Sequence, residues 1–358
     1  MATKIPFATA NTRPFSENLQ DGLTRDRLIQ ACEDFACSFR KSMNKKDLAK
    51  CLETKLLKDP RTLAERIPLR DLLQLQKLVH AGGYLQTEEP LLFSVLESNW
   101  IVMAPTDENS TEYMDEEFED FFHCAISENL RQALLPVIDD FVKDPFILEM
   151  DRKEQMIRGL ITLYGVLSIK QLVRIIVQMT DEKLEEKDIL NLFHFRMELK
   201  MEIMPFFYKN DLCFAHESMD DPSLFYAKVL KRKDLDYAIF PIDYVLLSTE
   251  PISIFQHPSA DLLIHLLGEK NKDDQMIAYF QMFLIWQAIQ SDIKLTEIIS
   301  MVSETTEWHS MDEINRFVQA LTTFQNGIPH WILKGHIPND LQKQSPINMD
   351  NLFNPFFS

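Results

Sequence analysis

The sequence has little glycine and lacks the glycine-rich motifs that bind phosphates. Eight of its 358 residues are glycine, which is far below the usual share of roughly 7%. Neither GxGxxG, GxxxxGK[ST] nor GxSxG occurs, so the sequence gives no sign of a nucleotide-binding loop or a hydrolase nucleophile. Because Leu, Ile, Met, Lys, Glu and Gln are plentiful, we expect mostly helices joined by short turns.

Long apolar runs and secretory features are absent too. No window reaches about 18 apolar residues, and the most apolar stretch, Met276 to Ile289, is interrupted by Gln281 and Gln287. It therefore predicts a buried helix, with Tyr279, Phe280 and Phe283 on one face, rather than a membrane span. The first residues do not have the apolar core of a signal peptide. We expect a cytoplasmic protein that does not contact membranes.

The cysteines show no metal-binding or disulfide pattern. There are five of them, and no CxxC, HExxH or HxH motif occurs. Cys32 and Cys37 are five apart on a predicted helix, and Cys213 and His216 are three apart on a predicted strand. The side chains of each pair should therefore point in different directions, so neither pair should bind one metal ion together. We expect free thiols in a reducing compartment, no bound metal and no cofactor. The cysteines are Cys32, Cys37, Cys51, Cys124 and Cys213.

The chain is strongly acidic and has one basic cluster. Its 37 basic and 55 acidic residues give a net charge of −18, which repels phosphate backbones at long range and disfavours nucleic acid as a partner. The cluster follows a helix that begins with Asp220 and Asp221, and the helix dipole accounts for this arrangement. A phosphate or partner contact is the alternative. The cluster consists of Lys228, Lys231, Arg232 and Lys233.

The central segment, Asp151 to His216, predicts three helices followed by a β-hairpin, the order of elements in a winged helix. Ser168 is a candidate cap for the second helix, and Lys209-Asn210-Asp211 is a candidate hairpin turn. The third helix carries more acidic than basic residues, unlike a helix that reads a DNA groove. Protein contact is therefore the expected use of this segment.

The remaining pattern predicts a mostly α protein, of α+β type, with one or two winged-helix-like units and a C-terminal helical domain. The acidic run 107–120 does not match a calcium loop and is expected to be a linker. His309, near Glu304, Glu307 and Asp312, is the only acid-base candidate, and we expect no enzyme activity. The expected domains are a loose arm 1–22, a helical and possibly winged-helix-like domain 23–120, a central domain 121–250, a helical domain 251–341 and a tail 342–358.

Two segments resemble a family of uncharacterised bacterial proteins. The C-terminal string Ile328 to Leu341 resembles that family's PxWxLxGxxPNEL ending, and the stretch Tyr164 to Ser168 with the hairpin after it resembles its winged-helix-like centre. Many members carry a SEC-C zinc knuckle after the ending. The tail of this chain contains no cysteine, so zinc does not carry over. The matching residues of the ending are Pro329, Trp331, Leu333, Gly335, Pro338 and Asn339.

These observations favour a non-enzymatic interaction or regulatory protein that binds an unidentified partner protein. The alternative is a nucleic-acid-associated regulator that uses the winged helix and the basic cluster. Trp331 and Asn339 are expected to hold the ending on the helical domain. The apolar side chains Phe353, Phe356 and Phe357 of the tail either pack on the body or are presented to a partner.

Overall fold

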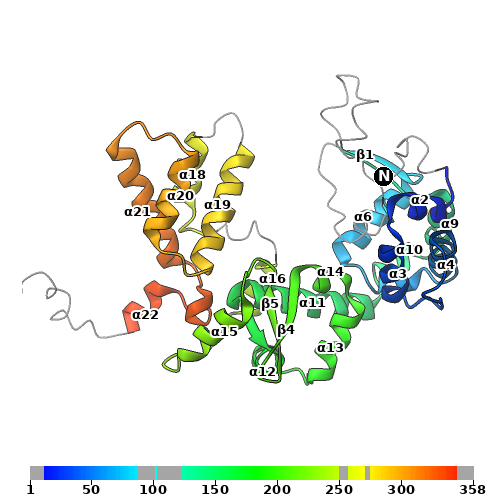
Figure 1. Ribbon diagram of the computed structural model, residues 1–358, viewed down its shortest axis with the longest axis horizontal. Coiled ribbons are helices and arrows are strands. Elements are labelled where there is room, and N and C mark those ends of the chain that lie inside the picture. Colours follow the sequence, from blue (N-terminus) through cyan, green and yellow to red (C-terminus); the bar gives the residue numbers. More distant parts are fainter. Residues whose placement is uncertain (1–11, 88–100, 103–121, 250–256, 271–274, 345–358) are drawn as a thin grey trace, which may run out of the picture. The chain divides into compact units, whose positions relative to one another are not determined.

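The computed structural model describes residues 12–87, 101–102, 122–249, 257–270 and 275–344 (Figure 1). The described chain is mostly helical with two small antiparallel sheets, which confirms the predicted fold class. The acidic run 107–120, most of the predicted strand at residues 100–103 and the Phe-rich tail lie outside the described residues. In the described part, no helix is both long enough and apolar enough to cross a bilayer.

The chain divides into two compact units. Met1–Glu154 and Leu190–Met201 form the first unit, and Gln155–Ile189 and Glu202–Ser358 form the second. Both boundaries fall inside helices, α11 (Pro145–Tyr164) and α13 (Glu186–Phe195). The sequence-based boundaries at 120 and 250 differ because they were placed at changes in composition, whereas the unit boundaries lie within continuous helices.

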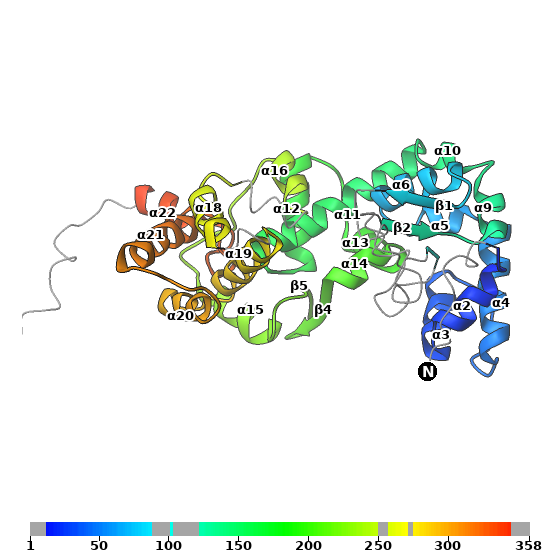
Figure 2. The same cartoon turned by 90° about the horizontal axis from the view of Figure 1, so that it is seen from above.

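The first unit is a helical cluster with a two-stranded sheet. Helices α2 and α3 both pack on α4 (Figure 2), and the strands β1 and β2 pair antiparallel with Tyr84 opposite Ala125. Its elements, besides the start of α11 and the end of α13, are α2 (Phe15–Gly22), α3 (Arg25–Asp34), α4 (Lys45–Lys58), α5 (Arg61–Ala64), α6 (Leu69–His80), β1 (Tyr84–Thr87), β2 (Phe122–Ala125), α9 (Glu128–Leu134), α10 (Ile138–Phe141) and α14 (Met197–Glu202).

The expectation of a loose arm over residues 1–22 is wrong for its second half, because residues 15–22 form α2. Phe15 and Leu19 are fully buried in the core of the first unit. The first backbone N–H groups of α2 donate to side chains from other helices, Phe15 N to Asn129 Oδ1 at 3.2 Å and Ser16 N to Glu53 Oε1 at 3.0 Å. Distant caps of this kind leave no local sequence signal.

A buried charge network lies in the first unit. Arg196 has no exposed surface. Its guanidinium donates to Asp151 Oδ1 at 3.1 Å, to Glu154 Oε2 and to the carbonyl of Glu65 at 3.3 Å. Both carboxylates are themselves buried. Because an unpaired charge in such a place is very costly, the three side chains depend on one another.

The central segment of the chain follows the predicted order of helices and strands, except that the predicted third helix is divided into α13 and α14. Residues 190–201 of these two helices belong to the first unit. Helix α11 leads into β3 (Val166–Ser168), α12 (Ile169–Thr180) and α13, and the hairpin of β4 (Ile203–Tyr208) and β5 (Asp211–His216) follows α14. The three strands form one sheet in the order β3-β5-β4.

Local sequence signals explain the start of α12 and the hairpin turn. Ser168 and Gln171 form a capping box at the start of α12. Lys209 and Asn210 both have positive φ, at 46° and 70°, and Tyr208 pairs with Asp211. The turn is therefore a two-residue turn of the I′ kind, one residue shorter than the sequence suggested.

The C-terminal part of the second unit contains helices that stand side by side in Figures 1 and 2. α18 packs against both α19 and α21, and α20 packs against α19. A core of Leu263, Met282, Ile285, Phe317 and Phe324 lies between them. The elements are α15 (Pro222–Lys231), α16 (Ile242–Leu247), α18 (Asp261–Lys270), α19 (Gln275–Gln290), α20 (Leu295–Thr305), α21 (Met311–Gly327), η2 (Trp331–Leu333) and α22 (Pro338–Gln344).

Candidate functional site

The C-terminal ending is built into the core of the second unit. Trp331 is 1% exposed, and its ring contacts Phe225, His216 and Trp286 at centroid distances of 6.2, 5.2 and 5.6 Å. Its Nε1 donates to the carbonyl of Thr162 at 2.8 Å. The expectation that Trp331 fastens the ending is consistent with this packing.

Two glycines allow the two motif segments to interlock. Gly165 has φ +72°, and a Cβ there would lie 2.3 Å from the ring of Trp331. Gly335 has φ +81°, and a Cβ there would lie 2.5 Å from the ring of Tyr164. The stretch Tyr164-Gly165 and the ending are therefore complementary surfaces, although they are far apart in the sequence. Only glycine combines these angles with such close approach.

The other residues of the ending have different environments. Pro329 is buried, Leu333 and Pro338 are half-buried, and Asn339 is exposed. The expectation that Asn339 helps to fasten the ending is therefore not supported. Lys334, which occupies a variable position of the motif between Leu333 and Gly335, does so instead. Its Nζ donates to the carbonyls of Arg232 and Leu235, both at 2.6 Å, and burial lowers the pKa of its amine.

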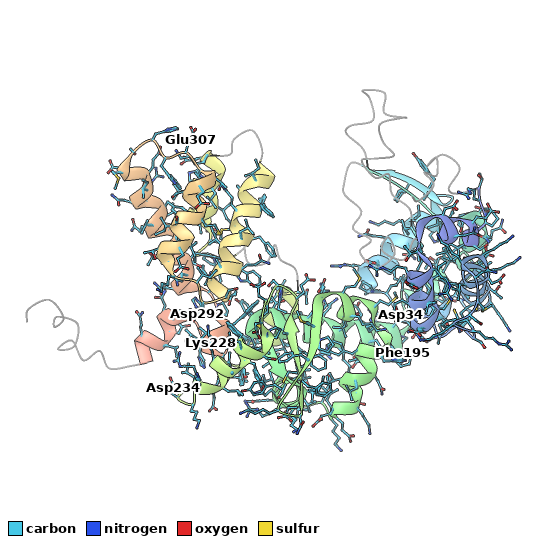
Figure 3. The ribbon with its side chains drawn as sticks, viewed as in Figure 1. Asp34, Phe195, Lys228, Asp234, Asp292 and Glu307 are labelled. Carbon is cyan, nitrogen blue, oxygen red and sulfur yellow. The ribbon has the colours of Figure 1, made fainter. Side chains whose placement is uncertain are left out.

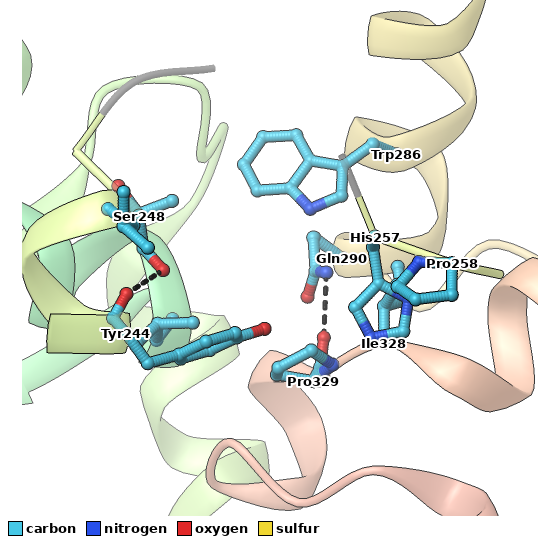
Figure 4. Close-up of a pocket in the computed structure, with 11 residues that line it drawn as sticks. Tyr244, Ser248, His257, Pro258, Trp286, Gln290, Ile328 and Pro329 are labelled. Carbon is cyan, nitrogen blue, oxygen red and sulfur yellow. Dashed lines mark hydrogen bonds between the residues drawn. The ribbon is translucent and has the colours of Figure 1, made fainter. Parts of the chain in front are cut away.

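A pocket of about 210 Å³ opens beside Trp286, whose ring contacts that of Trp331 (Figure 4). Its walls come from α11, α16, α19 and the segment before η2. None of its lining residues is Asp, Glu, Lys or Arg. The lining residues are Thr162, Leu163, Tyr244, Leu247, Ser248, His257, Pro258, Trp286, Gln290, Ile328 and Pro329.

The side chains of Gln290 and Ser248 in this pocket are already hydrogen-bonded within the protein. Gln290 donates through Nε2 to the carbonyl of Pro329 at 2.9 Å, and its Oε1 accepts from the N–H of Trp331 at 3.0 Å. Ser248 Oγ donates to the carbonyl of Tyr244 at 2.8 Å (Figure 4). What remains for a ligand is mainly apolar surface.

The titratable groups of the pocket are uncharged at neutral pH. Burial lowers the pKa of His257 below 6.5, and its Nδ1 lies 2.6 Å from Ser259 Oγ. Burial raises the pKa of the Tyr244 hydroxyl. A neutral imidazole and a neutral phenol, without a carboxylate in the lining, do not form an acid-base pair of the kind that catalysis uses.

An aromatic stripe on α19 leads from the pocket wall into solvent, from buried Trp286 through half-buried Phe283 to exposed Tyr279. Tyr279, Phe283 and Trp286 follow one another at spacings of four and three, so they share a face of the helix. Phe283 stacks on Trp286 with centroids 5.8 Å apart. Tyr279 is 38% exposed and Phe280, beside it, is 61% exposed. Across the pocket, Leu247 of α16 is 63% exposed.

The expectation that α19 is a buried helix with Tyr279, Phe280 and Phe283 on one face is therefore only partly right. The structure buries Met282, Ile285 and Ile289 and leaves Phe280 in solvent. A helix that is apolar on every side has no periodic signal that selects its buried face. The pocket residue Trp286 was missed for the same reason, and the surplus of apolar residues on α19 was the available signal. Tyr244 and Leu247 were missed because they lie on the short helix α16, which the sequence did not predict.

The structure pairs part of the basic cluster with acid groups. Lys228, Lys231 and Lys233 are exposed, whereas the guanidinium of Arg232 pairs with Asp234 at 2.9 Å. This pairing lowers the pKa of the Asp234 carboxyl. Figure 3 shows Lys228 on α15 and Asp234 just beyond the end of that helix.

Carboxylates also stand close to the lysine at the start of the cluster. Lys228 lines a shallow pocket of about 140 Å³ together with Asp220 and Asp221. The local charge is therefore mixed, which weakens attraction for a phosphate.

His309 does not lie at the centre of an acid-base group. Its side chain is exposed, and so are those of Glu304 and Glu307. Its backbone N–H donates to Glu313 Oε2 at 2.9 Å, and that carboxylate pairs with Lys270 at 2.5 Å. Both interactions use Glu313 in the first turn of α21, so they belong to the start of that helix. Within the described residues, no group of three or more His, Cys, Asp or Glu side chains is arranged to hold a metal.

Comparisons with family models, with curated proteins and with solved structures gave no match to this chain. The resemblance to the bacterial family stays a prediction.

Proposed function

We propose that this chain is a non-enzymatic cytoplasmic interaction protein that binds a partner protein at the pocket beside Trp286. The observation that carries the proposal is an uncharged apolar pocket that continues into an exposed aromatic stripe. Exposed apolar surface of this kind, rimmed by polar residues, is typical of protein-binding sites. Aromatic side chains are also enriched among the residues that dominate binding energy.

We also propose that the segment from α11 to β5 is a winged helix that supports this site. The element order and the strand order β3-β5-β4 support the assignment. The pocket uses Thr162 and Leu163 at the end of α11, and Trp331 fixes that end by its bond to Thr162. The winged helix would then hold one wall of the docking pocket instead of reading nucleic acid.

Membership of the resembling bacterial family remains part of this proposal. Its support is that the two motif segments, Tyr164 to Ser168 and the C-terminal ending, pack on each other through Gly165 and Gly335. Residues that must fit together are expected to occur together in a sequence family. The nucleic-acid alternative gains no specific support, because Arg232 pairs with Asp234 and Lys228 stands among carboxylates.

The test is an affinity capture of the tagged full-length protein from its own cells, with and without nuclease. A Leu247→Asp, Phe280→Asp double variant places two charges on the docking surface. Met311→Asp is the matched control, because Met311 is 68% exposed and stands at the start of α21, where an acid is tolerated. Loss of an apolar anchor typically weakens binding by about 2 kcal/mol, or roughly 30-fold.

We expect the wild type and the control to retain the same partners after nuclease, and the double variant to lose them. Retention of those partners by a folded double variant would contradict the pocket as the binding site. Loss of the partners on nuclease treatment would favour the alternative, and Lys231→Glu with Lys233→Glu would then be the variants to compare.

A further inference from the structure

Three of the five cysteines converge in the first unit. α3 ends at Asp34, and Ala36 adopts a left-handed conformation with φ 52°. The chain therefore folds back over the end of α3 instead of continuing as a helix. The N–H of Cys37 donates to the carbonyl of Cys32 at 2.8 Å. The expectation that Cys32 and Cys37 point apart is wrong, because it assumed that both residues lie on one helix.

This backbone hydrogen bond limits the separation of the two residues. With an N···O distance of 2.8 Å and ordinary bond lengths, the two Cα atoms are no more than about 7 Å apart. Disulfides usually join Cα atoms separated by roughly 4.4–6.8 Å. The two thiols are also close enough to shift each other's pKa, downward for Cys32 and upward for Cys37. Cys32 and Cys37 therefore meet the main geometric condition for a disulfide without a large backbone movement.

The third cysteine approaches from α4. Cys32 Sγ donates to the carbonyl of Leu48 at 3.6 Å, and Cys51, one turn further along α4, donates to the carbonyl of Ser38 at 3.4 Å. Both of the other thiols influence the pKa of Cys51, which burial raises. Cys32 is fully buried, whereas Cys37 and Cys51 are half-buried. The trio is not arranged to hold a metal ion, so its chemistry is that of thiols.

We propose that Cys32 and Cys37 form a reversible oxidation site, in which a peroxide that reaches the half-buried Cys37 produces a Cys32–Cys37 disulfide. Neither the docking pocket nor its proposed partner is involved. The inference rests only on the first unit and stands or falls independently of the proposed function.

The reaction balances with hydrogen peroxide as the oxidant. The Cys37 sulfur attacks one peroxide oxygen, the O–O bond breaks, and the thiol proton leaves with the other oxygen as water, which gives a sulfenic acid. The Cys32 sulfur then attacks the Cys37 sulfur. An S–S bond forms, the S–O bond breaks, and the hydroxyl leaves with the Cys32 proton as a second water. A dithiol reverses the oxidation by thiol–disulfide exchange.

The interaction between the two thiols assists the second step. The hydrogen bond from Cys37 is the main reason that the pKa of the Cys32 thiol lies below its ordinary value. When the pair loses one proton, the anion is stabilised by the proton that remains between the sulfurs. The same interaction, together with burial, raises the pKa of Cys37, so the anion of the pair is the Cys32 thiolate. Cys37 meets the oxidant because it is the more exposed sulfur, and the Cys32 thiolate is the reactive form that then attacks it.

The test is peptide mapping of the full-length protein after treatment with hydrogen peroxide and alkylation of the remaining thiols. Trypsin cleaves after Arg27 and Arg40, so one peptide, residues 28–40, contains both Cys32 and Cys37. Cleavage after Lys50 and Lys55 places Cys51 in a separate peptide, residues 51–55. An internal disulfide in 28–40 and a bond from it to Cys51 are thus distinguished by mass.

We expect peptide 28–40 from the oxidised protein to carry no alkyl label and to be two hydrogens lighter than the unlabelled dithiol peptide. Reduction with dithiothreitol before alkylation should restore both labels. Cys51→Ser should leave this result unchanged, whereas Cys37→Ser should keep the label on Cys32. Circular dichroism would confirm that each variant is folded. A cross-link between 28–40 and 51–55, or full labelling of 28–40 at peroxide doses that oxidise exposed methionines, would overturn the proposal.

Discussion

A single added methyl group at Gly165 should destabilise the second unit strongly. Gly165 has φ +72°, a conformation that costs a residue with a Cβ roughly 1–2 kcal/mol. The new Cβ would also lie 2.3 Å from the buried ring of Trp331, and overpacking of this kind typically costs about 1–3 kcal/mol. We therefore expect Gly165→Ala to lower the free energy of unfolding by about 2–5 kcal/mol.

Two other glycines separate the contributions. Gly268 lies in α18 with ordinary helical φ and has no atom within 4 Å of an added Cβ, so Gly268→Ala should stabilise the protein by up to about 1 kcal/mol. Gly82 has φ +88° and the same free space, so Gly82→Ala should show the conformational cost alone, roughly 1–2 kcal/mol in the first unit.

Urea unfolding followed by circular dichroism measures all three variants. The two units can unfold in separate transitions, so the midpoint of each transition is compared with that of the wild type. If Gly165→Ala is no less stable than the wild type, or loses no more than Gly82→Ala, the close contact between Gly165 and Trp331 is refuted. The interlocking of the two motif segments would then lose its physical basis.

Two further predictions concern buried charge. Arg196→Met removes the cation that pairs with buried Asp151 and Glu154, so the free energy of unfolding should fall by about 3–5 kcal/mol. The control Arg174→Met, at an exposed position, should change it by less than about 0.5 kcal/mol. Equal effects of the two variants in urea unfolding would contradict the network. Burial lowers the pKa of His216 from 6.5 to about 4. As the pH falls, His216 is therefore protonated in the unfolded chain before it is protonated in the folded one. The free energy of unfolding is unaffected above pH 6.5 and falls by up to about 3 kcal/mol as the pH drops to 4. His216→Phe should reduce the difference in Tm between pH 7 and pH 4.5, and an unchanged difference would contradict the prediction.

Local sequence signals were sufficient for the central segment. Ser168 and Gln171 are neighbours on the first turn of α12, and their capping box depends only on that spacing. Ile169, Leu172, Ile175 and Ile176 recur at helical spacing, and all four are buried. A strong local signal and the tertiary fold agree here, so the sequence alone predicted these helices and the hairpin.

Periodicity was less informative where a helix is apolar all round or where its cap comes from far away. On α19 it could not decide between the face of Met282 and the face of Phe280, because both are apolar. At α2, the capping groups Asn129 and Glu53 are distant in the sequence. The first failure hid the proposed docking surface, and the second hid the first helix.

The sequence by itself determined the helical class, the order of helices and strands from α11 to β5 apart from the division of the third helix into α13 and α14, and the absence of recognisable nucleotide motifs. These features depend on spacing and composition over a few residues. The tertiary structure alone decided which residues meet: Trp331 with Gly165, Tyr244 and Leu247 around the pocket of Trp286, and Cys37 with Cys32. Such contacts are set by where helices end and how they pack. A single left-handed residue, Ala36 with φ 52°, is enough to turn two cysteines that were expected to diverge into neighbours.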